Sequence, residues 1–245
     1  MTADLLLVDD GEGIRTITIN RPEVKNALTA AMRTRLCELL AEADDAAEVR
    51  AVVITAVDPV FSAGVDFREA ATGPPSARNP GKALRAMTTP VICAVNGACV
   101  TGALEIALSC TFVVASERAR FADTHARLDV VAAWGLTALL PRAVGVRKAA
   151  EMSITGNFVD AEEALRLGLV NHVVPHEELV AFTHALALDV AKTGAVTEVL
   201  DLYRRGDGLP LADALALEAQ HVTGRVFDPA AFGAAGAATA ARGKS

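Results

Sequence analysis

The sequence is poor in aromatic residues and contains no long apolar run. Its 245 residues include one Trp, one Tyr and eight Phe. No stretch approaches the roughly 18 apolar residues that a transmembrane helix needs. The N-terminal residues, MTADLLLVDDGEG, carry acidic groups where a secretory signal peptide has a basic start. We therefore expect a soluble protein that is not exported and does not bind membranes.

Cysteine is also scarce, and its spacing argues against two kinds of site. The chain has no CxxC pair and no Cys/His spacing typical of a metal centre, and a chain of this length does not need disulfides for stability. It lacks a GxGxxG phosphate loop after a strand. We expect no metal, no redox cofactor and a reducing, cytoplasmic location. The four cysteines are Cys37, Cys93, Cys99 and Cys110.

Basic residues are fewer than acidic residues. Lys and Arg number 23 against 30 Asp and Glu, which gives a formal net charge of −7. Such a balance argues against a broad nucleic-acid footprint, so an anionic substrate must be met by local positive groups. Apolar residues make up 52% of the chain and charged residues 22%, which is typical of one large globular domain.

Strand and helix patterns alternate over the first 175 residues and predict an α/β fold with largely parallel pairing. Residues 4–8 and 14–19 resemble a hairpin, and Thr29 is placed to cap a helix over 29–46. Residues 51–56 are apolar on both faces, as a strand inside a sheet is. The further expected elements are strands at 90–96, 111–116 and 169–174 and helices at 102–109 and 160–168.

The remaining segments predict a second region and a surface loop. Residues 68–82 carry Gly and Pro punctuation, which predicts a loop that could cover a pocket. From residue 177 to about 225 the pattern is helical only, and 230–245 is rich in Ala and Gly without apolar periodicity. We expect a core over 1–190 and a helical region with a tail over 191–245, the tail fraying unless a neighbouring subunit orders it.

Three segments together indicate a family. They are Ile19-Asn-Arg-Pro-Glu-Val-Lys-Asn-Ala-Leu28, Val60-Phe-Ser-Ala-Gly-Val-Asp-Phe67 and Asn96-Gly-Ala-Cys-Val-Thr-Gly-Ala-Leu-Glu105. Their order and spacing resemble the crotonase superfamily, the enoyl-CoA hydratase/isomerase family. The likeness continues through Leu140-Pro-Arg-Ala-Val-Gly145 and covers about residues 12–180.

The resemblance implies a fold, an assembly and a class of substrate. It implies a core of repeated ββα units and a C-terminal helical region that packs at a trimer interface, often in a dimer of trimers. It also implies an acyl-CoA thioester substrate of fatty acid metabolism, with CoA entering only as part of that substrate.

The second and third segments imply an oxyanion hole. Two backbone N–H groups aimed at one thioester oxygen stabilise the negative charge that develops in an enolate. By motif position these donors belong to Val65 and Gly102, and the second gains from the start of a helix. Gly64 allows a turn that other residues resist. Taken singly, each glycine could equally be an ordinary turn residue.

The resemblance also implies a CoA site. Relatives line the pantetheine and adenine pocket with the residues that follow the first oxyanion donor. Lys25 matches a basic residue near the CoA phosphates, although a solvated surface lysine is an equal reading. Main-chain groups are expected to bind the adenine end. The candidate CoA-binding residues are Lys25, Ala27, Ala63, Gly64, Asp66 and Phe67.

Glu105 is the principal catalytic candidate. It is the only charged residue in an otherwise apolar helix, where an unpaired charge is unfavourable if the helix is buried. The alternative is a polar stripe of Thr101, Glu105 and Ser109 facing solvent. In hydratases of the family, the glutamate at this position works with a second carboxylate to hold water and move its proton.

The sequence departs from the hydratase pattern at the second carboxylate. His125 stands at the matching position, and histidine can also exchange protons near neutral pH. Asp129, four residues later, could orient the imidazole if the segment forms a helical turn; both could instead be surface residues. Val130 to Ala133 replace a Pro/Gly turn, and Thr101 and Ala103 replace family glycines. We expect a narrower or reshaped acyl pocket.

These features lead to one main hypothesis with two alternatives. The main hypothesis is a lyase that reversibly adds water to a 2-enoyl-CoA, with Glu105 and His125 as the catalytic pair. An alternative is another enolate reaction of the superfamily, either double-bond isomerisation or acyl-CoA decarboxylation. The second alternative is a CoA-ester binding protein without catalysis. An RNA-binding role, known for some relatives, is disfavoured by the acidic charge.

Overall fold

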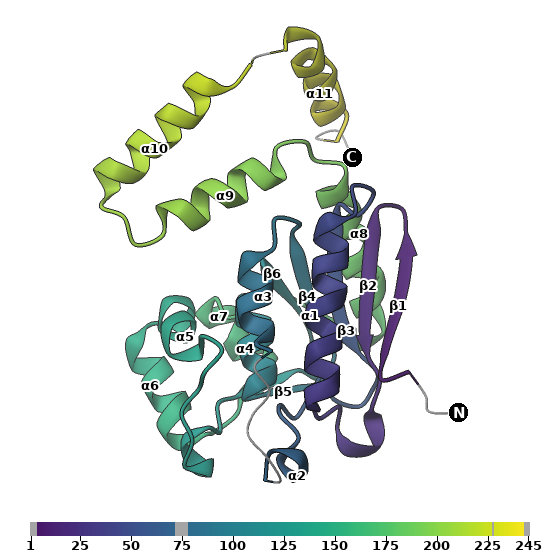
Figure 1. Cartoon of the computed structure of the whole chain (residues 1–245), viewed down its shortest axis with the longest axis vertical. Coiled ribbons are helices and arrows are strands. Elements are labelled where there is room, and N and C mark those ends of the chain that lie inside the picture. Colours follow the sequence, from purple (N-terminus) through teal and green to yellow (C-terminus); the bar gives the residue numbers. More distant parts are fainter. Residues whose placement is uncertain (1–3, 72–77, 227, 243–245) are drawn as a thin grey trace. The chain divides into compact units, whose positions relative to one another are not determined.

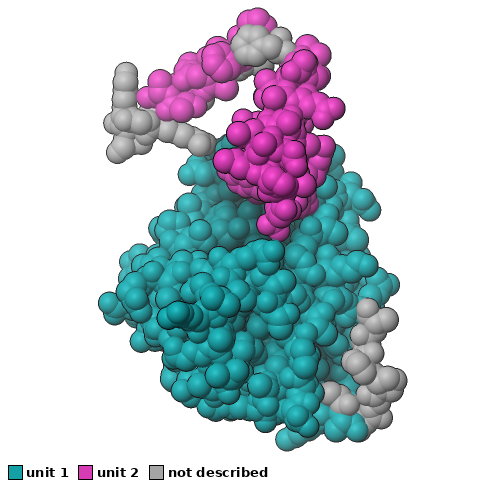
Figure 2. Space-filling model, turned by 90° about the vertical axis from the view of Figure 1, so that its left-hand side faces the viewer, with its two compact units in different colours: residues 1–197 teal, residues 198–245 magenta. Residues whose placement is uncertain are grey.

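The structure, a computed structural model, describes residues 4–71, 78–226 and 228–242. The chain divides into two compact units, residues 1–197 and 198–245 (Figure 2). The sequence predicts a boundary at residue 190, inside helix α8 (Leu179–Ala191). That helix belongs to the first unit because its buried side chains pack against the sheet. The division falls instead in α9 (Val196–Gly206).

The first unit is built on a six-stranded sheet in the order β1-β2-β3-β4-β6-β9. The β1–β2 hairpin is antiparallel, and every other pair in this sheet is parallel. The predicted α/β class with largely parallel pairing is therefore confirmed. The strands are β1 (Leu6–Gly11), β2 (Ile14–Ile19), β3 (Ala51–Ala56), β4 (Val91–Val95), β6 (Phe112–Ser116) and β9 (His172–Val174).

Both faces of this sheet are covered by helices. Every residue of β3 is buried, and alternate residues point to opposite sides, as the pleat requires. Val52 and Ile54 pack in the larger core, with α1 (Ala30–Asp45) and α3 (Pro80–Ala86). Residues on the other face, such as Val53, pack under α8. Figure 1 shows α1 and α8 on opposite sides of the sheet.

Local signals set the helix ends as predicted. Thr29 caps α1, and its hydroxyl accepts a hydrogen bond from the amide of Met32 at 3.2 Å. Asp160 caps α7 (Ala161–Leu167) by accepting the amide of Glu163 at 2.8 Å. Gly168 ends α7 in the left-handed conformation, with φ of 78°.

A second, three-stranded sheet positions the functional residues. It consists of β5 (Ala98–Val100), β7 (Arg120–Ala122) and β8 (Val159–Asp160) in the order β5-β7-β8. Strands this short carry too few residues for an alternation pattern, so the sequence does not predict them. The parallel β5 and β7 bring the start of α4 (Gly102–Ser109) beside the segment that contains His125.

The predicted loop over 68–82 is partly wrong. It contains α2 (Phe67–Ala70), and α3 begins at Pro80. Asn79 caps α3 by accepting the amide of Lys82 at 2.8 Å. A proline in the first turn has no amide to leave unpaired, so it starts a helix as readily as it interrupts one. Residues 72–77 of this prediction lie outside the described residues.

The other helices complete the first unit and form the second. In the second unit α9 is followed by α10 (Leu211–Gly224) and α11 (Pro229–Arg242). The terminal stretch is helical rather than frayed up to residue 242, because alanine has the highest helix propensity. The remaining helices are η1 (Pro22–Val24), η2 (Ala126–Leu128), α5 (Leu136–Val144), α6 (Val146–Thr155) and η3 (His176–Glu178).

Within the described ranges, no single helix has the length and apolar composition of a membrane span. His176–Ala191 and Val196–Gly206 meet those criteria only as a pair joined across a 94° bend.

Candidate active site

The predicted catalytic residues line one cavity of about 700 Å³ in the first unit. Val65, Glu105 and His125 come from three separate segments of the chain and share this cavity, together with Ala63 and Phe67. Its further lining residues are Arg33, Ala71, Thr101, Leu128, Val130, Val131, Ala133 and Trp134. Apolar walls with a few polar groups at one end are typical of a small-molecule site.

The two predicted oxyanion segments meet. Gly64 has a φ of +89°, and a Cβ built on it would lie 2.9 Å from the Val100 oxygen and 3.2 Å from the Gly102 nitrogen. A side chain at position 64 would therefore enter the space in front of the second amide. The flanking strand bonds fix this turn, since Gly64 O accepts from Leu28 and the Asp66 amide donates to Leu28 O.

Both proposed donor amides lack a backbone partner within the described part of the chain. Gly102 is the first residue of α4, where amides have no partner within the helix. Among the described residues, no backbone acceptor is bonded to the Gly102 or Val65 amide. Thr101, which precedes the helix, has the unusual φ of 56°, and its amide donates to Ala122 O at 2.9 Å. The small sheet thus holds the start of α4 in place.

Glu105 is buried, with 2% of its surface exposed. Its Oε1 accepts the backbone amides of Trp134 at 2.6 Å and Leu136 at 3.2 Å. Burial raises the pKa of this carboxyl, and the two amides oppose that rise. The solvent-facing stripe considered as an alternative is excluded, because Thr101, Glu105 and Ser109 are all buried.

The carboxylate that contacts His125 is not the predicted one. Asp123 Oδ1 lies 2.6 Å from Nδ1 of His125 and also accepts the His125 amide at 3.1 Å. Asp129 is exposed and ends the short η2 turn in the left-handed conformation. The segment makes a 3₁₀ turn here, which carries residue 129 away from the ring instead of stacking it as an α-helical turn would.

Asp123 is suited to hold the ring because it stays ionised. Burial alone would raise the pKa of Asp123, but hydrogen bonds from His125 and Ser153 lower it below its usual range. An ionised acceptor at Nδ1 selects the tautomer that carries its proton there. The free Nε2 then faces Glu105 Oε2 at 3.6 Å. Glu105 and His125 therefore present two proton acceptors to the same part of the cavity.

The residues predicted to bind CoA differ from one another in exposure and in contacts. Lys25 is exposed, and its carbonyl accepts the Ala63 amide at 3.0 Å. Ala27 O accepts from the Arg21 guanidinium. Asp66 is buried and committed, since it pairs with Arg21 at 2.5 Å and caps α2. Its charge is thus already matched by Arg21, and its predicted contact with CoA remains a prediction.

The wall of the cavity beside the start of α4 is formed by Trp134 and by residues of the 128–133 segment. A Cβ on Gly102 would lie 2.9 Å from Cζ3 of Trp134, so the indole packs directly on the start of α4. Val130 and Val131 are 50% and 82% exposed at the rim. Phe67, 60% exposed, also lies on the rim. The Trp134 ring and the branched side chains of Val130 and Val131 thus form this part of the cavity wall.

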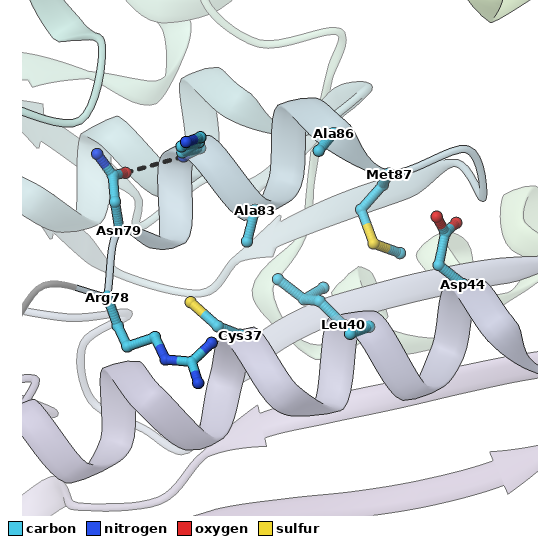
Figure 3. Close-up of a pocket in the computed structure, with 10 residues that line it drawn as sticks. Cys37, Leu40, Asp44, Arg78, Asn79, Ala83, Ala86 and Met87 are labelled. Atoms are coloured by element: carbon cyan, nitrogen blue, oxygen red, sulfur yellow. Dashed lines mark hydrogen bonds between the residues drawn. The ribbon is translucent and has the colours of Figure 1, made fainter.

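A second hollow, of about 410 Å³, lies between α1 and α3 and contains none of the motif residues (Figure 3). Asp44 at one end accepts the amides of Thr88 and Thr89, which joins α1 to the segment that follows α3. It is lined by Cys37, Leu40, Ala41, Asp44, Arg78, Asn79, Lys82, Ala83, Ala86 and Met87. Within the described residues, no three His, Cys, Asp or Glu side chains are grouped as a metal site requires.

Three residues in or beside the cavity were missed from the sequence. Asp123 could have been found from its place two residues before His125, in a segment already aligned with the family's second carboxylate. Trp134 could have been noted as the only tryptophan, although nothing local relates it to Gly102. Arg33 lies on the predicted helix 29–46, and no sequence signal distinguishes it from the solvated arginines of that helix.

Comparison with known proteins agrees with this geometry. The profile of the Enoyl-CoA hydratase/isomerase family matches residues 9–224. An Arabidopsis thaliana protein named "Probable enoyl-CoA hydratase 1, peroxisomal" is 36% identical over 215 residues, which are 84% of this chain and 80% of the relative.

Solved structures agree as well. A crystal structure of enoyl-CoA hydratase from Mycobacterium tuberculosis is 46% identical with a TM-score of 0.79, covering 89% of this chain and 97% of that one. One from Mycobacterium avium is 43% identical with a TM-score of 0.77, covering 89% and 95%. The chain belongs to the enoyl-CoA hydratase/isomerase family, the crotonase superfamily.

Proposed function

We propose that this protein is an enoyl-CoA hydratase-type lyase that adds water across the double bond of a 2-enoyl-CoA thioester. The observation that carries the proposal is that Val65, Glu105 and His125 line one cavity, with Glu105 Oε2 3.6 Å from His125 Nε2. The start of α4 at Gly102 lies beside the Gly64 turn, where a Cβ on Gly64 would be 3.2 Å from the Gly102 nitrogen. The similarity to hydratases over most of the chain supports the same activity.

The first part of the mechanism concerns the thioester oxygen. The amides of Val65 and Gly102 donate to it and polarise the enoyl system, so that C3 becomes electrophilic. When water adds, negative charge develops on the same oxygen and these bonds strengthen. Removing one such donor typically reduces kcat by about 10²- to 10³-fold. The N-terminal end of α4 adds a favourable dipole at this point.

The second part concerns the water. A water molecule donates one hydrogen bond to Glu105 Oε2 and one to His125 Nε2, which aims its lone pair outward at C3. Glu105 Oε1 is held by two amides, and so Oε2 is the oxygen left for this task. As the C–O bond forms, the pair accepts a proton from water, and the same pair delivers a proton to C2.

The same geometry weighs against the rival reactions. Isomerisation and decarboxylation need the oxyanion amides but only one group for proton transfer. Here His125 Nε2 lies 3.6 Å from Glu105 Oε2, and Asp123 holds the imidazole in place. Such a second proton acceptor is useful when a water molecule must be oriented. A binding protein without catalysis has no need to bury the Glu105 carboxyl at this point.

The activity is tested by the loss of enoyl absorbance with short, medium and aromatic 2-enoyl-CoA esters. We expect saturable turnover in the wild type and a loss of at least about 10³-fold in Glu105→Gln. This loss lies within the 10²- to 10⁴-fold that one acid–base group typically contributes. Glu151→Gln, an exposed glutamate paired with Lys148, is the matched control and should be unchanged. Binding of CoA esters with no turnover by the wild-type chain would refute the proposal.

We also propose that the protein assembles as a homotrimer or a dimer of trimers. Helix α10 of the second unit has no buried residue, although it carries several large apolar side chains. Light scattering after size exclusion should give a mass that is a multiple of three chains, and a monomer at micromolar concentration would contradict this. The exposed large apolar residues of the unit are Val199, Tyr203, Leu209, Leu211, Leu215, Val222, Val226 and Phe232.

A further inference from the structure

Arg33 places a positive charge in the wall of the catalytic cavity without a carboxylate to balance it. The residue lies in the middle of α1, is 4% exposed and lines the cavity. Its Nε donates to Thr29 O at 3.4 Å, and its guanidinium lies 5.6 Å from the centre of the Trp134 ring. In the part of the chain that the structure describes, no carboxylate comes within ion-pair distance of it.

Most of the hydrogen-bonding capacity of this guanidinium is therefore unused. Arginine carries five N–H donors in a planar fork, and among the described residues an acceptor is found only for the one on Nε. Burial lowers the pKa of Arg33, and the field of Glu69 partly opposes that effect. Glu69 itself accepts the Ala30 amide at 2.6 Å, at the start of α1. An arginine remains charged in such surroundings, so the charge faces the cavity.

The position of Trp134 relates this charge to the reacting centre. One edge of the indole packs on Gly102, where a Cβ would lie 2.9 Å from Cζ3. The Arg33 guanidinium lies over the same ring. The proposed oxyanion amide and the cation are thus separated by about the width of one indole. The phosphates of CoA are removed from the thioester by the whole pantetheine arm, so a group that reaches Arg33 over this ring belongs to the acyl chain.

We propose that Arg33 binds a terminal carboxylate on the acyl group, and that the substrates are CoA thioesters of dicarboxylic acids with a 2,3 double bond. The planar fork suits a carboxylate, which it can hold through two parallel N–H···O bonds. The bound anion would supply the partner that the buried cation lacks. This inference rests on the proposed function only for the placement of the thioester.

Binding of saturated esters tests the inference apart from the chemistry, because these esters cannot be hydrated. Glutaryl-, adipyl- and suberyl-CoA are each compared by calorimetry with the monocarboxylic ester of equal chain length. We expect at least one dicarboxylic ester to bind the full-length protein at least about 30-fold more tightly than its partner, the lower range for a buried charged pair. Equal or weaker binding of all three would overturn the proposal.

Variants identify the residue responsible. Arg33→Met should abolish the preference, measured as the ratio of the two affinities within each pair of esters, whereas Arg33→Lys should retain part of it, because lysine keeps the charge without the fork. Arg35→Met removes an exposed arginine of the same helix, paired with Glu38 and Glu42, and should change nothing. If Arg33→Met does not fold, Arg33→Gln replaces it. A preference that survives the loss of the charge would overturn the assignment.

Turnover then separates this inference from the proposed function. With matched 2-enoyl-CoA pairs, the wild-type chain should show a higher kcat/KM for the dicarboxylic member, and Arg33→Met should lose that ratio while retaining turnover of the neutral member. Hydration without such a ratio leaves the proposed function intact and overturns the inference. Arg33-dependent binding of dicarboxylic esters without hydration would support the inference and overturn the proposed function.

Discussion

Asp123 Oδ1 lies 2.6 Å from Nδ1 of His125 and 3.1 Å from the His125 backbone amide. One carboxylate oxygen therefore fixes both the orientation of the imidazole and its tautomer. Because Asp123 is buried, a turn of the ring would remove a hydrogen bond from an ionised carboxylate that has little access to water. The Nε2 atom that this arrangement presents to Glu105 is the basis of the expected proton transfer.

Asp123→Asn should lower kcat at least about 10²-fold with little change in KM, because an amide at this position permits the wrong tautomer. The pH profile of kcat should shift with it. Asp129→Asn is the matched control, since Asp129 is exposed and the three residues of η2 separate it from His125. A greater loss in Asp129→Asn than in Asp123→Asn would restore the residue expected from the sequence.

Gly64→Ala should reduce turnover about 10²-fold or more, the effect of losing one oxyanion donor. The new Cβ would lie 2.9 Å from the Val100 oxygen and 3.2 Å from the Gly102 nitrogen, both backbone atoms that cannot move independently. Gly145→Ala is the control. Gly145 has a similar φ of +80°, but a Cβ there meets nothing within 4 Å.

Both alanine variants carry the backbone strain of a positive φ, about 1 kcal/mol for a residue with a side chain. Thermal unfolding should therefore show a loss of stability in both, and only Gly64→Ala should also lose activity. Full activity of Gly64→Ala, measured at the same temperature, would mean that the turn does not shape the oxyanion site.

The pH dependence of stability should reveal the two buried carboxyls with opposite signs. The pKa of Glu105 is raised above 4.5, so its contribution to stability is complete below pH 4.5 and is lost as pH rises through the folded-state pKa. The pKa of Asp123 is lowered below 3.8, so its contribution is present above pH 3.8 and is lost as pH falls.

Denaturant unfolding between pH 4 and 8 measures the Glu105 effect by comparison with Glu105→Gln, whose amide does not titrate. The free energy of unfolding of the wild type, relative to this variant, should decrease as pH rises above 4.5. A difference that stays flat or increases over this range would show that the Glu105 carboxyl is not destabilised by burial.

The parts of the fold that the sequence predicts well are those whose signals are local. The apolar run of β3 and the Thr29 cap of α1 were both found where the structure has them. The strands β5 and β7 were missed because three residues show no period, yet they place α4 against the His125 segment. Their pairing is a long-range property of the chain.

The residues of the candidate site also divide into those with local sequence signals and those brought together only by the fold. Glu105 and His125 were found because the motifs that contain them have family counterparts. Asp123 replaces Asp129 because the backbone forms a 3₁₀ turn, whose residues per turn differ from those of the α-helix assumed from the sequence. The role proposed for Arg33 depends on Trp134, which lies 101 positions later and meets it only through the tertiary fold.

A double-mutant cycle of Glu105→Gln and His125→Ala in the hydration of a 2-enoyl-CoA tests whether the two side chains hold one water molecule together. Residues that hold one water together act as a unit, so the double variant should be no more than about 10-fold slower than the worse single variant. Losses in kcat that multiply, or one silent single variant, would contradict a shared water between Glu105 Oε2 and His125 Nε2.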